Sequence, residues 1–365
     1  MKLLFITPRT PSPPSGGRAL LSALHRDCLS SLLGERLLIE ELDTAPTGGA
    51  GAAAKRLLGH IDGATPQAAR RLVDRARREG VTHIYLDGSN LGRIAGAFRR
   101  SLPNVEILCF FHNVEARFFM GAWRETRRLR ALGVLAANFL AERTAARASH
   151  KVITLSERDS RGLARLYGRG GTHLLPMAMD DKLDLRASGS SGRDKGGYAL
   201  FVGGAFYANE AGIRWYADQV APHVAMETRV VGRGLEGLRP ALERHPNVKL
   251  VGAVDNLQDS YLDATVVIAP IFDGSGMKTK VAEALMFGKK IVGTPEAFSG
   301  YEASADSAGW VCRSREEFVA VLEQIRDEPP QRFDPGLRAI YEQLHSREAT
   351  RRRLAEILAI PRGQG

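Results

Sequence analysis

The chain has 365 residues, of which 44% are hydrophobic and 25% charged, and its formal net charge is +10. This composition excludes wholesale disorder, and the length exceeds the roughly 250 to 300 residues at which single cores stop growing, so we expect two domains. Three cysteines, odd in number and far apart, fit neither a disulfide framework nor a paired metal site. The N-terminal apolar run is too short for a signal peptide, and no stretch approaches the ~20 apolar residues of a membrane span. We therefore expect a cytoplasmic protein.

The positive charge is concentrated in the first half of the chain. Residues 1–185 hold 28 Lys and Arg against 18 Asp and Glu, which accounts for the whole excess. Within residues 117–130, arginines alternate with Phe118, Phe119 and Trp123 at roughly helical spacing. Such a segment suits an anionic membrane surface or an acidic acceptor, and equally a solvated arginine face on a core helix. No recognised nucleic-acid motif accompanies the charge, so we expect no nucleic-acid partner.

Short apolar runs alternate with longer helical patterns along the chain, which predicts an α/β fold with parallel sheets. We expect strands at residues 2–7, 37–41, 83–87, 106–111 and 151–155, and again at 199–203, 228–232, 249–251, 266–270 and 290–294. Two sets of five imply two sheets. We place an N-terminal domain at residues 1–185, a Gly- and Ser-rich linker at 186–197 and a C-terminal domain at 198–328. In residues 329–365, the spacing of apolar side chains predicts helices that pack back toward the N-terminal domain.

The most informative segment runs from an expected strand through Gly274-Ser275-Gly276 into an expected helix that ends at Gly288. Glycines permit positive φ and close backbone approach, and a helix N-terminus that follows a strand is a ready anion site. Lys278 and Lys280 add positive charge there, although lysine at a helix start opposes the helix dipole. Gly-rich turns of this kind are common in α/β proteins, so this segment alone is weak evidence for phosphate binding.

Glu283 lies eight residues after Ser275, about two helical turns, so both side chains can face one cleft. A carboxylate at this place is able to accept both hydroxyls of a ribose. In the first half, His112 ends an expected strand, and the carboxyl ends of strands in open α/β sheets are where ligands bind. A capping or core histidine is the alternative. Ser156 and Asp159 have the pattern of a helix N-cap with an acid in the first turn.

The order and spacing of these blocks resemble those of GT-B glycosyltransferases of the family 4 type, which are retaining and use sugar nucleotides. The likeness extends from Pro8 to about Tyr301. It rests on Gly16-Gly17 after a Pro-rich loop, His112-Asn113-Val114-Glu115, residues 152–159, 201–204, 230–234 and 252–255, and the segment from Gly274 to Glu283. The resemblance implies two Rossmann-like domains facing a cleft, with the donor held mainly by the C-terminal domain.

The resemblance also assigns roles to individual residues. It implies that His112 contacts the donor sugar and acts with Glu283 at the reaction centre, and that Glu283 and Val254 bind the nucleoside. Glu115 and Arg117 are expected on the acceptor side, with an ion pair between them as the alternative. The residues expected to bind donor sugar and diphosphate are Gly16, Gly17, Gly204, Arg233, Ser275, Gly276, Met277, Lys278 and Lys280. For Gly16 and Gly17, a plain turn is the alternative.

The sequence departs from the family pattern at two places. Many relatives carry two glutamates in the last segment, and the first of them is Ser275 here. Many also place an Arg and a Lys after the first strand of the C-terminal domain, where this chain has Gly204 and Glu210, so Lys278, Lys280 or Arg233 are the candidate replacements. No Asp-x-Asp triplet occurs, so we expect neither a metal nor another cofactor.

The resemblance therefore predicts a glycosyltransferase that moves a sugar from a nucleotide-diphosphate donor to a glycan or lipid-linked glycan. Retention of configuration and a role in surface polysaccharide or glycoconjugate synthesis are implied by the family alone. Two alternatives stay open at this point. A sugar-nucleotide epimerase would turn over the donor without an acceptor, and a glycosyltransferase-like subunit without activity would only bind a partner or a membrane.

Overall fold

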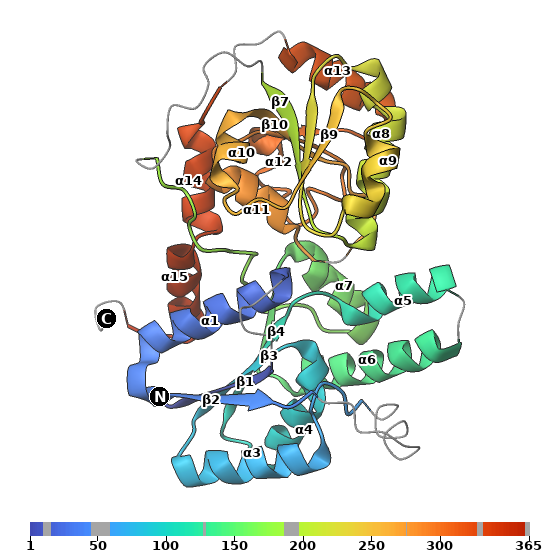
Figure 1. Ribbon diagram of the computed structural model, residues 1–365. Helices are drawn as coiled ribbons and strands as arrows, with labels where there is room; N and C mark the ends of the chain where they lie inside the picture. The colour runs from blue at the N-terminus through green and yellow to red at the C-terminus, as the bar shows by residue number, and fades with distance from the viewer. Residues whose placement is uncertain are drawn as a thin grey trace. The chain divides into compact units, whose positions relative to one another are not determined.

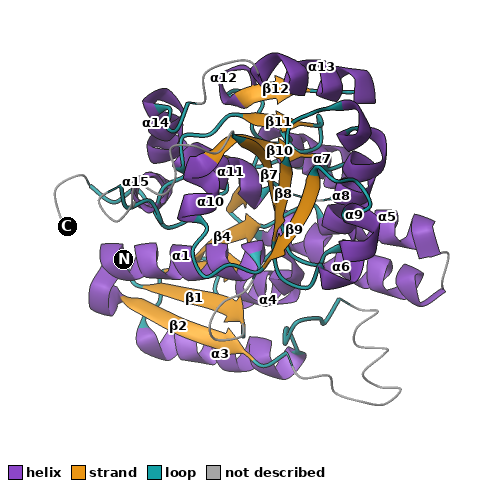
Figure 2. Cartoon of the chain, turned by 45° about the horizontal axis from the view of Figure 1, so that its top comes forward, coloured by secondary structure: helices purple, strands orange, loops and turns teal. Residues whose placement is uncertain are grey.

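The computed structural model describes residues 1–9, 16–44, 59–126, 129–185, 197–274, 276–326 and 331–361, without the side chains of residues 122 and 124–130. The chain divides into an N-terminal unit, residues 1–176 with 350–365, and a C-terminal unit, residues 177–349. Each unit is built on a six-stranded parallel sheet with helices on both faces (Figures 1 and 2). The two parallel sheets expected from the sequence are confirmed.

The sheet of the N-terminal unit has the spatial order β2-β1-β3-β4-β5-β6. Its strands are β1 (Leu3–Pro8), β2 (Leu37–Leu42), β3 (His83–Asp87), β4 (Glu106–Phe111), β5 (Lys151–Thr154) and β6 (His173–Leu174). Every residue of β1 is buried, and so are all but the first residues of β3 and β4. Strands covered on both faces are apolar throughout, which is why these segments read as continuous hydrophobic runs in the sequence.

Helices cover both faces of this sheet. They are α1 (Gly17–Leu33), η1 (Gly34–Arg36), α3 (Pro66–Glu79), η2 (Ser89–Leu91), α4 (Gly92–Ser101), α5 (Glu115–Thr126), α6 (Leu129–Ala148) and α7 (Glu157–Tyr167). One face forms a core with α3, α4, α6 and α7, in which Leu72 and Phe98 are fully buried. Burial of each such side chain contributes roughly 1.5–3 kcal/mol. On the other face, His25 of α1 packs edge-on against Phe110.

The sheet of the C-terminal unit has the order β12-β11-β10-β7-β8-β9. Its strands are β7 (Tyr198–Val202), β8 (Thr228–Val231), β9 (Val248–Gly252), β10 (Ala264–Ala269), β11 (Ile291–Gly293) and β12 (Gly309–Val311). In both sheets the neighbouring strands are parallel. Within each sheet, the carboxyl ends of the strands therefore lie at one edge. The loops that carry the sequence motifs begin at this edge.

The helices of the C-terminal unit are α8 (Tyr207–Gln219), η3 (Ala221–His223), η4 (Glu236–Leu238), α9 (Arg239–Leu242), α10 (Gln258–Asp263), α11 (Thr279–Met286), α12 (Ala305–Ala308), α13 (Arg315–Arg326) and α14 (Pro335–Leu344). One face of the sheet packs on α8, α9 and α13. The other face contacts α10 and α11, and α14 packs on α11 (Figure 1). The last helix, α15 (Arg347–Ile357), begins among the residues of the C-terminal unit and ends among those of the N-terminal unit.

All ten expected strands are present, with ends shifted by at most two residues, but the count of five strands per sheet is wrong. The additional strands are β6 and β12, which have two and three residues and lie at sheet edges. Such short strands, only partly buried, carry no apolar run for sequence analysis to detect. Residues 177–185, which we assigned to the N-terminal domain, group with the C-terminal unit. Nearly all of the expected linker, residues 186–196, lies outside the described residues.

The helix start predicted at Ser156 is confirmed. Ser156 caps α7, and its Oγ accepts a hydrogen bond from the amide of Asp159 at 3.2 Å. The three cysteines are buried and none of them forms a disulfide with another described residue. The basic segment 117–130 falls on α5 and the start of α6, but the side chains of its arginines at 124, 127, 128 and 130 are not described.

None of the helices, searched over the described residues, combines the length and apolarity needed to cross a bilayer.

Candidate active site

Three polar side chains of the N-terminal unit converge where the adjacent strands β1, β3 and β4 end. His112 Nε2 lies 2.9 Å from Asp87 Oδ1, and Thr7 Oγ1 donates a hydrogen bond of 2.7 Å to Asp87 Oδ2. All three residues are buried. Parallel pairing is what brings together residues so distant in sequence, because the carboxyl ends of these strands share one edge.

The protonation of this cluster follows from its surroundings. Burial raises the pKa of the Asp87 carboxyl, but the charge interaction and hydrogen bond with His112 and a hydrogen bond from Ser22 outweigh it, so the pKa lies below its usual range. Burial lowers the pKa of His112 despite the opposing effect of Asp87. An ionised carboxylate has no proton to donate, so Nε2 of the neutral imidazole carries the hydrogen. Asp87 thereby fixes the tautomer in which Nδ1 of His112 is a hydrogen-bond acceptor.

Glu115 begins α5 three residues beyond His112 and lies in a crowded electrostatic environment. Burial raises the pKa of its carboxyl to about 7, with Arg18 opposing this rise and Glu142 and Asp62 adding to it. Arg117 lies two residues further along α5, about half a turn, and is exposed. Glu115 is therefore poised between its neutral and charged forms near neutral pH.

The start of α5 is held by a buried carboxylate. Glu142 of α6 accepts hydrogen bonds from the backbone amides of Glu115 and Ala116, at 2.9 and 3.1 Å, and from the Tyr167 hydroxyl at 2.7 Å. A carboxylate at a helix N-terminus satisfies amides that have no partner within the helix and is favoured by the helix dipole. Glu142 therefore fixes the helix that presents Glu115.

Gly16 and Gly17 stand at the beginning of α1. Gly16 is the N-cap, with a φ of 85°, and Arg18 follows in the first turn. A Cβ atom at Gly88, directly after Asp87, would lie 3.0 Å from Arg18 Nη2, so this guanidinium lies over the end of β3. Sequence analysis missed Arg18, although it has the same signal as Lys278, a cation in the first turn of a helix that follows glycines.

The turn before α11 has the expected backbone. Gly274 and Gly276 have φ values of 138° and 67°, which side chains disfavour. Ser275 lies outside the described residues. Lys278 Nζ is 2.9 Å from Glu296 Oε1 and 3.0 Å from the carbonyl of Gly276, so its charge is already engaged within the loop. Met277 is buried and accepts a hydrogen bond at its Sδ from the amide of Met177. Only the backbone of Met277 remains for a ligand.

Lys280 points toward the first turn of α8, the helix that follows β7. Its Nζ is 3.0 Å from Asn209 Oδ1 and lies over the ring of Phe201, and Asn209 in turn donates to the carbonyl of Gly204 at 3.0 Å. Burial lowers the pKa of Lys280 to about 7, with Glu283 opposing and Lys278 reinforcing the shift. Lys280 and Gly204 are thus connected through Asn209. Lys280 is one of the three cations that we expected to replace the Arg and Lys of the family pattern, and this role stays a prediction.

The other expected donor residues lie at the same edge of the C-terminal sheet. Arg233 follows β8, and its carbonyl accepts a hydrogen bond of 2.9 Å from the amide of Ala205, next to Gly204. Val254 follows the edge strand β9, which β7 and β8 separate from β10. Gly204 and Arg233 are therefore neighbours, and the expected contact of Val254 with the nucleoside stays a prediction.

Glu283 on α11 has a partner at each carboxylate oxygen. The Tyr261 hydroxyl donates to Oε2 at 3.0 Å, and Lys182 Nζ lies 3.3 Å from Oε1. Tyr261 stacks on Phe287 at a centroid distance of 4.6 Å, which fixes its ring. Sequence analysis missed both partners. Among the described residues, no three His, Cys, Asp or Glu side chains form a group able to hold a metal ion. The expectation that no metal is needed stays a prediction.

Comparison with solved structures defines the fold class as GT-B. Sucrose-phosphate synthase from Thermosynechococcus elongatus is similar with a TM-score of 0.73 and 15% identity over 98% of both chains. For the lipopolysaccharide outer core galactosyltransferase WaaB, the TM-score is 0.66 at 12% identity, over 98% of this chain and 99% of that one. Anabaena HepE in complex with UDP gives 0.67 at 15% identity, over 98% of this chain and 100% of that one. The two Rossmann-like sheets therefore form a GT-B fold.

Residues 196–327 match the family model described as glycosyl transferases group 1. This range contains the whole C-terminal sheet, the α11 turn and Glu283. Curated proteins gave no match to the chain. The group 1 match and the GT-B fold together support a GT-B glycosyltransferase.

Proposed function

We propose that the protein transfers a sugar from a nucleoside-diphosphate donor to a glycan or lipid-linked glycan acceptor, with retention of configuration as in enzymes of the family 4 type. The observation that carries this proposal is the arrangement at the start of α11. Two glycines with positive φ precede the helix, and the nearby ammonium of Lys280 forms a hydrogen bond with Asn209, which itself donates one to the carbonyl of Gly204. A diphosphate is the ligand chemistry that suits amides and a buried cation combined.

In the proposed donor complex, the amides of Gly276, Met277 and Lys278 bind the diphosphate, and Lys280 neutralises its charge. Arg233 and Gly204 border the same loops. The nucleoside diphosphate then departs through an oxocarbenium-like state, stabilised by these fixed dipoles and by the lysine. The proposal requires no metal, because cations of the chain offset the charge of the leaving group.

For the N-terminal unit we propose that the neutral imidazole of His112 accepts a hydrogen bond from the transferred sugar at Nδ1. Asp87 supports this role by fixing the tautomer. Gly16 and Gly17 offer backbone amides at the start of α1, and Glu115 and Arg117 contact the acceptor. Near neutral pH, a carboxyl with a pKa of about 7 exists in both its neutral and its charged form. The Glu115 carboxyl is therefore able to donate a hydrogen bond to a hydroxyl of the acceptor substrate or to accept one from it.

The first donors to test are UDP-sugars. Two of the similar structures are HepE complexes with UDP and with UDP-glucose. We further propose a cytoplasmic location, with the basic segment 117–130 contacting anionic lipid. Sedimentation with phosphatidylglycerol vesicles, but not with phosphatidylcholine vesicles, is the expected result for this contact.

A screen of UDP-, GDP- and ADP-sugars by thermal shift tests the proposal. A donor at ~100 times its dissociation constant adds about 2.7 kcal/mol to stability. The donor found is then incubated with a glycan extract, and the anomeric configuration of the product is read by NMR. Acceptor-dependent release of the nucleotide supports a transferase. Donor turnover without acceptor would instead indicate an epimerase, and the absence of any nucleotide-sugar binding would overturn the proposal.

A further inference from the structure

The carboxylate of Glu283 retains hydrogen-bonding capacity beside its two internal partners. A carboxylate has about four lone-pair sites, two on each oxygen. Among the described residues, Tyr261 uses one site on Oε2 and Lys182 one on Oε1. One site therefore remains on each oxygen, which matches the two adjacent hydroxyls of a ribose. The Glu283 side chain is 11% exposed and that of Lys182 is 52% exposed, so the pair borders solvent on the lysine side.

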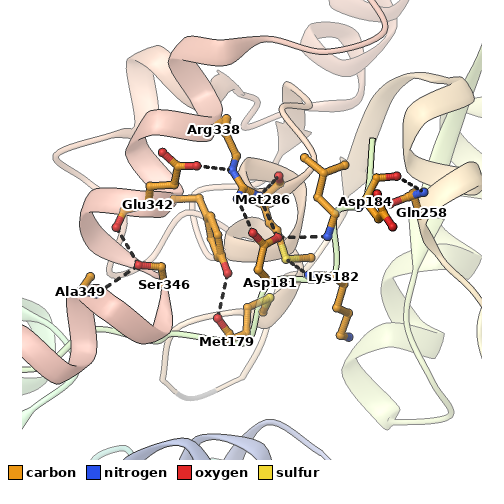
Figure 3. Close-up of polar contacts among 12 residues, drawn as sticks. Met179, Asp181, Lys182, Asp184, Gln258, Met286, Arg338, Glu342, Ser346 and Ala349 are labelled. Atoms are coloured by element: carbon orange, nitrogen blue, oxygen red, sulfur yellow. Dashed lines mark hydrogen bonds and ion pairs between the residues drawn. The ribbon is translucent and has the colours of Figure 1, made fainter. Parts of the chain in front are cut away.

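Lys182 lies on the segment 177–184. Residues before and after Lys182 in this segment form hydrogen bonds with helices of the C-terminal unit. On one side, the Tyr341 hydroxyl donates to the carbonyl of Met179 at 2.9 Å, and Arg338 Nη1 donates to Asp181 Oδ1 at 2.9 Å. Figure 3 shows this stretch running beside α14, with Arg338 directed at Asp181.

On the other side of Lys182, Gln258 of α10 anchors Asp184. The side-chain nitrogen of Gln258 donates to the Asp184 carbonyl at 3.0 Å, and its oxygen accepts the Asp184 amide (Figure 3). The amide of Lys182 itself donates to the Sδ atom of Met286, the last residue of α11. The backbone that carries the Lys182 ammonium is thus fixed next to the helix that carries Glu283.

We infer that Lys182 belongs to the nucleoside subsite as a positioning residue for Glu283. This inference rests on the proposed function. Lys182 holds Oε1 while Tyr261 holds Oε2, so the carboxylate keeps one orientation with a free lone pair on each oxygen. Lys182 acts on the nucleotide through Glu283, and its effect depends on the ribose hydroxyls and not on the phosphates.

The test compares binding of UDP and of 2′,3′-dideoxy-UDP, which lacks both hydroxyls, by calorimetry. The wild type is expected to prefer UDP. In Lys182→Met the ratio of the two affinities falls roughly two- to fivefold, the range of a half-exposed ion pair, and Lys182→Arg restores it. Any general effect of charge on diphosphate binding cancels in the ratio. Asp180→Asn is the matched control, because Asp180 is on the same segment but pairs with Arg347. It leaves the ratio unchanged.

Three results would overturn the inference while leaving the proposed function standing. An unchanged ratio in Lys182→Met means that Lys182 does not position Glu283. Equal weakening of both nucleotides means that it contacts the phosphates. Tighter binding of UDP to Lys182→Met means that it blocks the site. Failure of the wild type to bind UDP, GDP or ADP would overturn the proposed function and this inference with it.

Discussion

Lys280 gives the proposed diphosphate site a defined pH dependence. Burial lowers the pKa of Lys280 from 10.5 to about 7, so the free protein loses this charge as the pH rises through neutrality. A bound diphosphate favours the ammonium and raises the pKa again. Affinity is therefore fully present below pH 7 and falls above it, by about tenfold at pH 8 and about a hundredfold at pH 9. Binding at pH 8 takes up about 0.9 proton.

Calorimetric titration with UDP in buffers of different ionisation enthalpy measures both quantities. At every pH, Lys280→Met is expected to bind UDP as weakly as the wild type does at high pH, and without proton uptake. Lys290→Met is the matched control, since Lys290 is exposed at the amino end of β11 and lies over Trp310. A flat affinity between pH 7 and 9 in the wild type, or uptake that persists in Lys280→Met, would refute the reasoning.

Further predictions concern the backbone and the buried polar groups. Asp87→Asn is expected to lower kcat roughly 10- to 150-fold, because a hydrogen bond to a charged group contributes about 1.5–3 kcal/mol, and to change the tautomer of His112 seen in its ¹⁵N shifts. Gly276→Ala costs about 1–2 kcal/mol at a φ of 67° and weakens UDP binding in titrations, unlike Gly237→Ala, where the added Cβ meets open space. Ser156→Ala lowers the free energy of unfolding in urea by about 1 kcal/mol.

Each of these predictions has an outcome that contradicts it. Unaltered ¹⁵N shifts of His112 in Asp87→Asn would show that Asp87 does not set the tautomer. Equal UDP affinity in the two glycine variants would remove the α11 turn from the binding site. An unchanged urea midpoint for Ser156→Ala would mean that the N-cap bond contributes nothing to stability.

The strands were predictable because of the way parallel sheets bury them. A strand such as β4, with helices on both faces, has to be apolar at consecutive positions, and turn residues bound each run. The short edge strands β6 and β12 do not have to be apolar at consecutive positions, because they pair with a neighbouring strand on one side only and are only partly buried. Their existence depends on neighbours that the local sequence does not reveal.

The site was predictable only where one segment contains the signal. The glycines and lysines of the α11 turn are consecutive in the sequence, and His112 ends a recognisable strand. Asp87, Tyr261 and Lys182 come from other segments and acquire their roles through hydrogen bonds to His112 or Glu283. Such pairs are set by the spatial order of strands and by packing between helices, and a single sequence has no local pattern for them.

The engagement of Lys278 illustrates the same limit. From the sequence, Lys278 and Lys280 are equal candidates for the diphosphate. In the structure, Lys278 forms an ion pair with Glu296, while Lys280 is directed at Asn209 in the first turn of α8. The position of Glu296 after β11 gives the two lysines different partners, and this position is a property of the folded sheet.

The central claim is that the amides at the start of α11 bind a nucleoside diphosphate whose ribose reaches Glu283. A crystal structure of the protein with UDP tests it most directly. We expect the diphosphate within hydrogen-bonding distance of the amides of Gly276 and Lys278, with the ribose hydroxyls on Glu283. A nucleotide bound at any other place, with the α11 turn left without phosphate, would contradict the account.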